Sequence, residues 1–330
     1  MFRSDGFYVD YDEHGHSTTD RYRVENGFVF YRMDDPKAWD TIVVRVPQSA
    51  ECWVPKIGFS GRMLEEHVRF INEKNITKAI VIADDLSFLK NCPTLTELSV
   101  IPSDDMEGTL DYSPLYDMPN LKKLICRTYR DSTEIPVGCV EYDRIEGLKE
   151  LYIEDSNRDK GYERCASLRT LCIQGLHKCD DLSGCFDAEG LRELDLVQGK
   201  MKTLNGLGRS RAMERMSVSH CRTLTDIGGL AEVADTLQFL EIDNCGKIKD
   251  FSVLEKLTNL QELILIGKNE LPDLHFLRNM PKLWRLVVNM NVRDGDLSLC
   301  RYIDYVYIYP DRRHYNLKDA ELSKNWRESK

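Results

Sequence analysis

The sequence predicts an α/β solenoid, in which each short repeat adds one strand to a parallel β-sheet and one tight helical turn to the opposite side. Three observations lead to this prediction. An apolar pattern with leucine favoured at its first, fourth and sixth positions recurs along most of the chain. Successive copies begin 19 to 27 residues apart, a period that fits a repeat containing a single strand. An aspartate recurs at a nearly fixed distance before the pattern.

The pattern is clearest at Leu260, Leu263 and Leu265, which form an L-x-x-L-x-L core. Eleven copies keep this register: Ile76/Ala79/Val81, Leu95/Leu98/Val100, Leu121/Leu124/Cys126, Leu148/Leu151/Ile153, Leu168/Leu171/Ile173, Leu191/Leu194/Leu196, Met213/Met216/Val218, Leu237/Leu240/Ile242, Leu260/Leu263/Leu265, Leu283/Leu286/Val288 and Ile303/Val306/Ile308. Both the core motif and the period are those of leucine-rich repeats. We therefore expect a leucine-rich repeat solenoid over residues 76–310, with a curved, parallel, concave β-sheet.

The recurring aspartate indicates how each convex turn begins. Asp85, Asp111, Asp181, Asp250 and Asp273 lie ten residues before the next first leucine; Thr203 takes the same place, and Asp226 lies eleven before. Asp and Thr side chains accept hydrogen bonds from free backbone N–H groups at the start of a helical turn. We therefore expect short helical or 3₁₀ segments on the convex side.

The chain before the repeats lacks the repeat pattern. Residues 1–60 are expected to form a small N-terminal β-rich cap, since Asn26-Gly27 supplies a type I′ hairpin turn within 22–31. Further strands are expected at Thr41–Val46 and at Cys52–Val54. A cap is needed because a terminal repeat otherwise leaves its apolar end open to water.

Two connecting segments complete the expected organisation. Residues 61–75 form a linking helix, because Leu64, Val68 and Ile71 recur at helical spacing. Residues 311–330 form a polar C-terminal tail, either as a weak helix or frayed.

Two segments carry a resemblance to known families. Residues 111–124 and 250–263, which run from the turn aspartate through the leucine core, resemble the short repeats of bacterial internalins and of a phosphatase-regulatory leucine-rich repeat subunit. The resemblance implies a curved solenoid that binds other proteins on its concave sheet. The repeats starting at Leu121 and Leu148 are longer and lack the aspartate, so loops are expected around 128–142.

Composition restricts the classes of partner. The net charge of −10 argues against nucleic acid as a partner, and the absence of an 18-residue apolar run argues against a membrane span. A polar N-terminus and eleven scattered cysteines without C-x-x-C pairs indicate a cytoplasmic, monomeric protein with reduced, buried thiols. Cys221, Cys245 and Asn291 occupy the repeat position where Asn or Cys is usual.

Metal and enzyme sites are weakly indicated. Cys165, Cys172, Cys179 and Cys185 with His177 do not match a zinc spacing, and His14 and His16 fit a polar turn better than a metal site. No cofactor-binding or catalytic motif is present in the sequence. The best enzymatic alternative is Cys172 as a nucleophile, but carboxylate neighbours such as Asp195 would raise its pKa.

Side chains in a strand alternate between faces, so the third, fifth and seventh positions of each repeat should line the concave face. The expected partner-binding residues are Glu193, Asp195, Phe239, Glu241, Asp243, Glu262, Ile264, Tyr305, Tyr307 and Tyr309. Tyrosines covered by the tail are the alternative at the last strand. An acidic strip beside an apolar, aromatic end suits a protein partner with a basic surface and an apolar anchor.

The expected function is therefore a non-enzymatic protein–protein interaction module. The alternative is a cell-surface or secreted adhesin of the internalin kind, and a thiol-dependent enzyme ranks below both.

Overall fold

The computed structural model describes residues 22–31, 40–46, 62–103, 106, 108–130, 135–136, 138–155, 158–177, 179–185 and 189–326. The expectations for His14, His16 and Cys52–Val54 fall outside this part of the chain. The molecule divides into two compact units, Met1–Leu168 and Arg169–Lys330.

The first unit begins with the predicted hairpin. Strands β1 (Tyr22–Glu25) and β2 (Phe28–Tyr31) are antiparallel, and they are joined at Asn26 (φ 53°) and Gly27 (φ 79°). These left-handed residues are what a type I′ turn requires. Strand β3 (Thr41–Val46) pairs antiparallel with β2 and parallel with β4 (Lys78–Ala83). Direct pairing therefore gives the first repeat strand a neighbour on its N-terminal side.

Helix α1 (Leu64–Glu73) lies within the expected linking segment. Its buried side chains are His67 and Ile71, whereas Leu64 and Val68 are only half-buried. The His67 ring packs edge-on against Phe28 at 5.0 Å, and Phe70 stacks on the same phenylalanine at 4.0 Å. Burial lowers the pKa of His67, so this imidazole takes part in the apolar contact in its neutral form.

The first strands of this unit are buried on both faces. Val29, Tyr31, Val43, Ile80, Ile82 and Ile101 form one buried apolar cluster. Ser99 and Ile101, expected on an open face, are therefore buried, at 2% and 6% exposure. The continuous apolar runs at 41–46 and 78–83 are typical of strands covered on both sides, a signal that the alternation rule does not use.

The remaining repeat strands of the first unit are parallel. The strand order is β1-β2-β3-β4-β5-β6-β9, with β5 at Glu97–Pro102, β6 at Lys123–Cys126 and β9 at Glu150–Glu154. The expected loops after β6 contain a small antiparallel pair, β7 (Tyr129–Arg130) and β8 (Ile135–Pro136).

The buried carboxylate of Asp159 ties these loops together. It accepts hydrogen bonds from the Thr128 hydroxyl at 2.9 Å and from the Val140 N–H at 2.8 Å.

The second unit has a parallel sheet in the order β10-β11-β12-β13-β14-β16-β18. Its strands are β10 (Thr170–Gln174), β11 (Glu193–Val197), β12 (Arg215–Ser219), β13 (Phe239–Asp243), β14 (Glu262–Ile266), β16 (Arg285–Val288) and β18 (Tyr305–Ile308). A second, two-stranded parallel sheet joins β15 (Glu270–Leu271) and β17 (Asn291–Val292).

The predicted register is confirmed. The fourth positions pair in one continuous row, Leu171, Leu194, Met216, Leu240, Leu263, Leu286 and Val306. Each is at most 1% exposed. The leucine column therefore forms the core, and the third, fifth and seventh positions face away from it.

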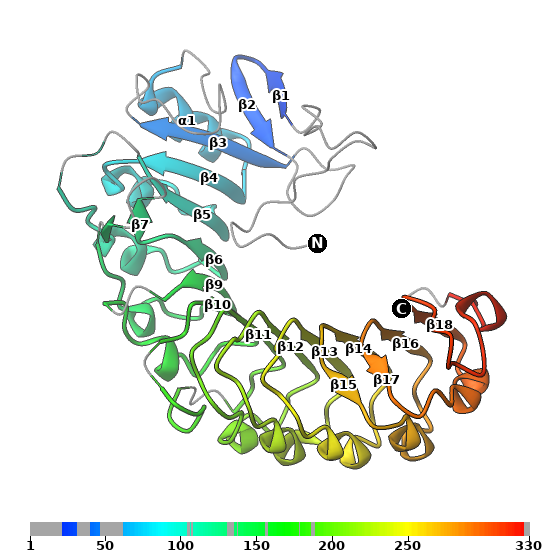
Figure 1. Ribbon diagram of the computed structural model, residues 1–330. Helices are drawn as coiled ribbons and strands as arrows, with labels where there is room; N and C mark the ends of the chain where they lie inside the picture. The colour runs from blue at the N-terminus through cyan, green and yellow to red at the C-terminus, as the bar shows by residue number, and fades with distance from the viewer. Residues whose placement is uncertain are drawn as a thin grey trace. The chain divides into compact units, whose positions relative to one another are not determined.

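Short 3₁₀ turns lie on the side opposite the sheet (Figure 1), as expected. They are η1 (Ser87–Asn91), η2 (Ser113–Asp117), η3 (Tyr142–Arg144), η4 (Tyr162–Arg164), η5 (Leu207–Arg209), η6 (Gly228–Val233), η7 (Ser252–Lys256), η8 (His275–Asn279) and η9 (Ser298–Tyr302). A further turn, η10 (Asp319–Glu321), lies in the tail beside β18, where Asp319 accepts a hydrogen bond from the Ile308 N–H at 2.8 Å.

The predicted turn aspartates do accept backbone hydrogen bonds. Asp85 accepts from the Ser87 N–H at 2.8 Å, Asp250 from Ser252 at 2.8 Å, and Asp273 from His275 at 2.7 Å. Asp111, Asp181, Thr203 and Asp226 bond in the same way to the residue two positions later.

Buried polar side chains form hydrogen bonds with backbone carbonyls where the chain leaves the sheet. The Cys221 and Cys245 thiols are buried and donate to the carbonyls of Leu196 and Val218. In the next repeat the buried side chain is Asn269, which donates to the Cys245 and Ile248 carbonyls at 3.2 and 2.8 Å. Asn291, expected in this role, is half-buried and donates instead to Glu270 at 2.8 Å.

We predict that Leu263→Ala lowers the free energy of unfolding by roughly 2–5 kcal/mol, because it leaves a cavity in the leucine row. The matched control is Gln261→Ala on the same repeat, whose amide lies at the surface and should cost under about 0.5 kcal/mol. Urea melts of both variants measure the difference. Equal losses would contradict the register.

Candidate functional site

The open face of the second unit is the side of its sheet opposite the leucine core. Three rows of side chains cross it, fixed by strand pairing. The third-position row is Thr170, Glu193, Arg215, Phe239, Glu262, Arg285 and Tyr305. The fifth-position row is Cys172, Asp195, Ser217, Glu241, Ile264, Val287 and Tyr307. The seventh-position row includes Gln174, Val197, Ser219, Asp243 and Ile266.

Two carboxylates lie half-buried in the fifth-position row. The pKa of Asp195 is raised to about 6, first by burial and then by the neighbouring Glu193 and Glu241, whereas Arg215 opposes the shift. The pKa of Glu241 is raised by burial and by Asp243, and its carboxylate accepts a hydrogen bond from the Ser217 hydroxyl at 3.4 Å. These charges lie close together, so a cation placed between them would stabilise the charged form of both.

Other predicted acidic residues already have close partners. Glu262 accepts a hydrogen bond from Arg285 Nη1 at 2.7 Å in a largely buried pair, and Asp243 accepts from the Asn244 amide at 2.8 Å. Glu193 is exposed at the surface. Arg215 lies over the Phe239 ring at 3.9 Å, so this phenylalanine is half-covered. The acidic strip is therefore interrupted by internal pairs that sequence spacing did not predict.

The aromatic end lies at the last two strands. Tyr307 and Tyr309 stack at 6.3 Å and are 42% and 58% exposed. Tyr305 is half-buried, with its ring edge-on to Trp326 at 5.0 Å. Ile264, expected to be presented on the face, is 8% exposed and offers little surface. The tail thus covers Tyr305 and places Lys324 over the ring of Tyr307, while Tyr307 and Tyr309 keep accessible surface.

Trp284 and Trp326 complete this cluster. Trp284, at the second position of its repeat, is 9% exposed and packs edge-on against Trp326 at 5.6 Å. Trp326 itself is 51% exposed. Its position beside β16 and β18 depends on the path of the tail, which no repeat pattern indicates.

The thiol alternative is not supported by the chemistry of Cys172. Burial raises the pKa of this thiol to about 12, and Asp195, its neighbour on the next strand, contributes to the shift. A thiol with this pKa carries almost no thiolate at neutral pH, and the thiolate is the nucleophile.

One cysteine pair stands apart from the expectation of reduced, separate thiols. The short loop between Cys179 and Cys185 brings their two sulfur atoms into contact. The other cysteines in the described part of the chain are free. Within that part, three or more His, Cys, Asp or Glu side chains nowhere gather as metal ligands would.

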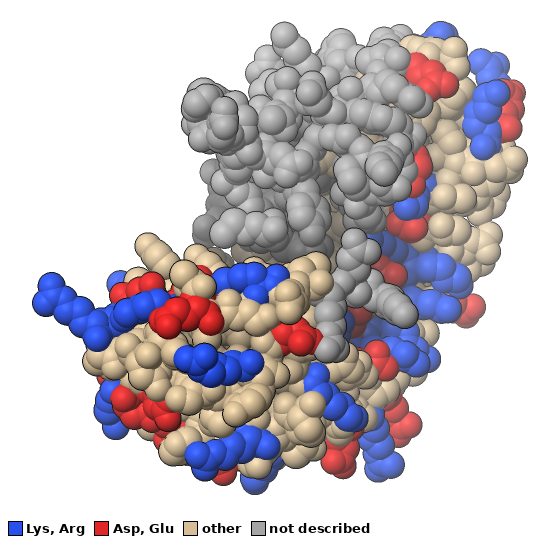
Figure 2. Space-filling view, turned by 90° about the vertical axis from the view of Figure 1, so that its right-hand side faces the viewer, with Lys and Arg blue, Asp and Glu red and all other residues tan. Residues whose placement is uncertain are grey.

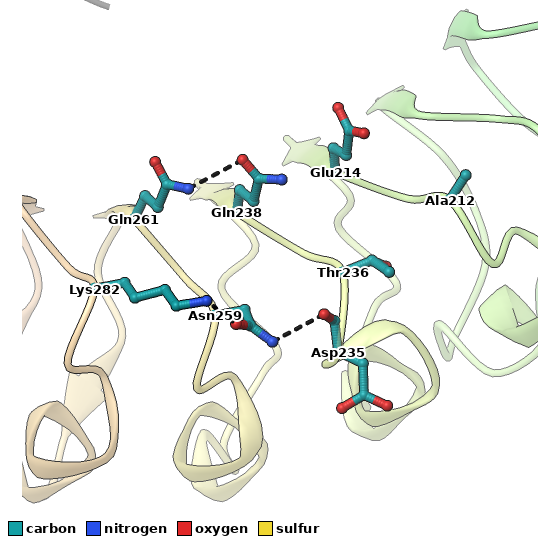
Figure 3. A pocket seen from close by; sticks show the side chains of 8 residues that line it. All are labelled: Ala212, Glu214, Asp235, Thr236, Gln238, Asn259, Gln261 and Lys282. Atoms are coloured by element: carbon teal, nitrogen blue, oxygen red, sulfur yellow. Dashed lines mark hydrogen bonds between the residues drawn. The ribbon is translucent and has the colours of Figure 1, made fainter.

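A groove of about 270 Å³ lies where the strands begin, outside the predicted site. It is lined by Ala212, Glu214, Asp235, Thr236, Gln238, Asn259, Gln261 and Lys282 (Figure 3). Gln261 donates to Gln238 at 3.1 Å, and Asn259 donates to the Asp235 carbonyl at 2.8 Å. Polar residues at the second position of successive repeats were the available signal, but the prediction considered only the third, fifth and seventh positions.

The surface carries charges of both signs. Figure 2 shows acidic and basic side chains interspersed with uncharged ones on the described residues that face the viewer. No described helix has both the length and the apolar character needed to cross a membrane.

We predict that Asp195→Asn stabilises the protein at pH 7.5 and has little effect at pH 4. Because the native pKa is about 6 and an unperturbed Asp titrates near 3.9, the native state binds the proton more tightly, and stability falls as pH rises through this window. Removing the charge should gain roughly 1–2 kcal/mol above pH 7, after allowance for partial exposure.

Chemical denaturation of the parent and the variant at both pH values measures this gain. Glu255→Gln, on the exposed surface of η7, is the matched control and should leave the pH dependence unchanged. A stability difference for Asp195→Asn that is independent of pH would contradict the prediction.

Proteins similar to this chain are found by comparing structures and not by comparing sequences. No family model matches the chain, and no curated protein matches it. Among solved structures it is similar to an internalin of Listeria monocytogenes, InlF, at a TM-score of 0.48 and 16% identity, covering 88% of this chain and 87% of that one. It is also similar to internalin C2 of the same organism, at 0.43 and 18% identity, covering 66% and 82%.

A third similar structure is TLR13 in complex with ssRNA13, at a TM-score of 0.47 and 15% identity; the match covers 70% of this chain and 42% of TLR13. The fold assignment depends on the chain's own repeats, strand register and turns, which identify it as a leucine-rich repeat solenoid.

Proposed function

We propose that the chain is a non-enzymatic protein-binding module whose partner docks on the open face of the second unit. The observation that carries this proposal is the pair of accessible tyrosines, Tyr307 and Tyr309, on the face that also holds the half-buried carboxylates Asp195 and Glu241. Exposed aromatic side chains on a rigid sheet are typical anchors of protein contacts.

The predicted acidic residues differ in whether a close basic side chain of the protein already pairs with them. Asp195 and Glu241, flanked by the exposed Glu193, are the carboxylates available to a cation of the partner, whereas Glu262 is already paired with Arg285. A lysine or arginine of the partner at this point would lower the pKa of Asp195 and keep it charged. An apolar group of the partner would lie on Tyr307 and Tyr309. The proposed partner is therefore a protein with a basic surface and an apolar anchor.

We propose that the protein binds its partner in the cytoplasm and as a monomer. The net charge of −10 makes nucleic acid an unfavourable partner for the proposed acidic face. The mostly buried free thiols suit a reducing compartment.

The test begins with a pull-down from the native cell to find the partner, followed by binding kinetics. Replacing Glu193 by Lys together with Glu241→Gln should lower the association rate severalfold at low salt, because it removes the attraction for a basic partner. The difference should shrink as salt rises, because screening shortens electrostatic range to about 8 Å at physiological ionic strength. Tyr307→Ala should speed dissociation roughly tenfold or more, as loss of an aromatic anchor does.

Lys256→Glu, on η7 on the far side of the sheet, is the control and should leave both rates unchanged. If the open-face variants bind like the parent while Lys256→Glu abolishes binding, the proposed face is wrong.

The second candidate is an extracellular adhesin. One observation favours it, the contact between the sulfur atoms of Cys179 and Cys185, because an oxidising compartment would convert such a pair into a lasting disulfide. The accessible aromatic residues would then contact a host or surface protein instead of a cytoplasmic one.

Thiol titration separates the two compartments. On protein purified from its native cell without reductant, the cytoplasmic proposal expects all eleven cysteines to react after denaturation. It also expects most of them to react slowly in the native state, since they are buried. Fewer than eleven reactive thiols after denaturation would support the adhesin and contradict the cytoplasmic assignment.

A further inference from the structure

The C-terminal segment 323–326 runs antiparallel beside the last strand, β18. The Val306 N–H donates to the Ser323 carbonyl at 2.9 Å, and the Asn325 N–H donates to the Asp304 carbonyl at 2.9 Å. Tyr305 and Lys324 form an antiparallel bridge. A strand at the edge of a sheet presents unpaired backbone groups that can accept another chain, and here the tail occupies that edge.

Two side chains of this segment lie on the open face. The Trp326 ring contacts Trp284 and Tyr305 edge-on, and the Arg285 guanidinium lies 4.8 Å from its centre. The Lys324 ammonium lies 5.4 Å from the Tyr307 ring and donates to Asp319 at 2.7 Å. A cation and an aromatic ring, two residues apart, thus occupy the aromatic end of the face.

The Ser323 hydroxyl also donates to the Asp304 carbonyl and the Lys324 ammonium to the Val306 carbonyl, yet part of the segment stays exposed. Trp326 is 51% exposed although it covers Trp284, which is 9% exposed. The Lys324–Asp319 ion pair lies at the surface, where such pairs contribute little. Since the segment is joined to the last repeat, it binds at a high effective concentration even if its contacts are weak.

We propose that the edge of β18, with Trp284, Tyr305 and Tyr307, is a docking site for an extended protein segment bearing a lysine two residues before a tryptophan. Such a segment pairs antiparallel with β18, and residues 323–326 occupy the site until a partner displaces them. This inference rests on the proposed function and specifies the basic and apolar groups that the partner brings. Recognition by strand addition supplies backbone hydrogen bonds, while the rings of Trp284 and Tyr305 select the aromatic side chain.

The probe is a labelled peptide with the sequence of residues 318–326, added to the full-length protein. It should bind the double variant Lys324→Ala, Trp326→Ala at least tenfold more tightly than the parent, in which the tail competes. Lys324→Ala alone should give an intermediate affinity and serves as the second variant if the double change destabilises the last repeat. The same peptide with Ala in place of its tryptophan should lose at least tenfold in affinity for the double variant.

Two controls locate the site. Tyr305→Ala added to the double variant should abolish peptide binding. Tyr302→Ala in the parent should leave the parent's weak affinity unchanged, because this tyrosine is 86% exposed at the end of η9. Melting curves confirm that each variant is folded.

Equal affinity for the parent and the vacated variants, or no binding to any variant, would overturn the docking site. Because the peptide assay contains no partner, these results leave the proposed function to its own kinetic test. Conversely, the peptide could bind as expected while the open-face variants leave partner binding unchanged. That result would contradict the proposed function and leave the docking site standing.

Discussion

The fold depends on one constraint, the in-register hydrogen bonding of parallel strands one repeat apart. Each pairing fixes the next, so the fourth-position side chains from Leu171 to Val306 stack in a single buried row. A shift of one residue in any strand would turn its leucines outward and its charged residues inward. This constraint also aligns the third, fifth and seventh positions of separate repeats into rows, which is how residues more than a hundred positions apart, such as Asp195 and Tyr307, come to share one face.

The turns make that register reproducible from repeat to repeat. An aspartate or threonine accepts the N–H two residues on, and a buried thiol or amide bonds the carbonyls where the chain leaves the sheet. Both are local interactions, so each repeat forms its own turn, and neighbouring repeats then bury the apolar side chains between them. Because the turns are short and repeat the same hydrogen bonds, successive strands start in the same register, and partially buried charges on the open face come close together.

The close spacing of carboxylates on the open face affects the pKa of Asp195. Burial raises the pKa of Asp195, and Glu193 and Glu241, brought near it by the pairing of β11 with its neighbours, add to the rise. Elsewhere on the same sheet the protein relieves such repulsion internally, as in the pair of Glu262 with Arg285. The uneven distribution of internal partners distinguishes the carboxylates that are available to a ligand from those that only stabilise the sheet.

The sequence by itself determined the repeats, their register, the hairpin at 22–31 and the hydrogen bonds of the turn aspartates, because each depends on spacing within one repeat or one turn. Only the tertiary structure decided which members of the predicted face are accessible. Ile264 is buried and Phe239 lies under Arg215, since cross-strand neighbours come from different repeats. It likewise decided that the strands near Ile80 and Ile101 are covered on both faces, and that the tail brings Trp326 onto Trp284. These contacts join residues far apart in the chain, and a pattern with a period of one repeat carries no information about them.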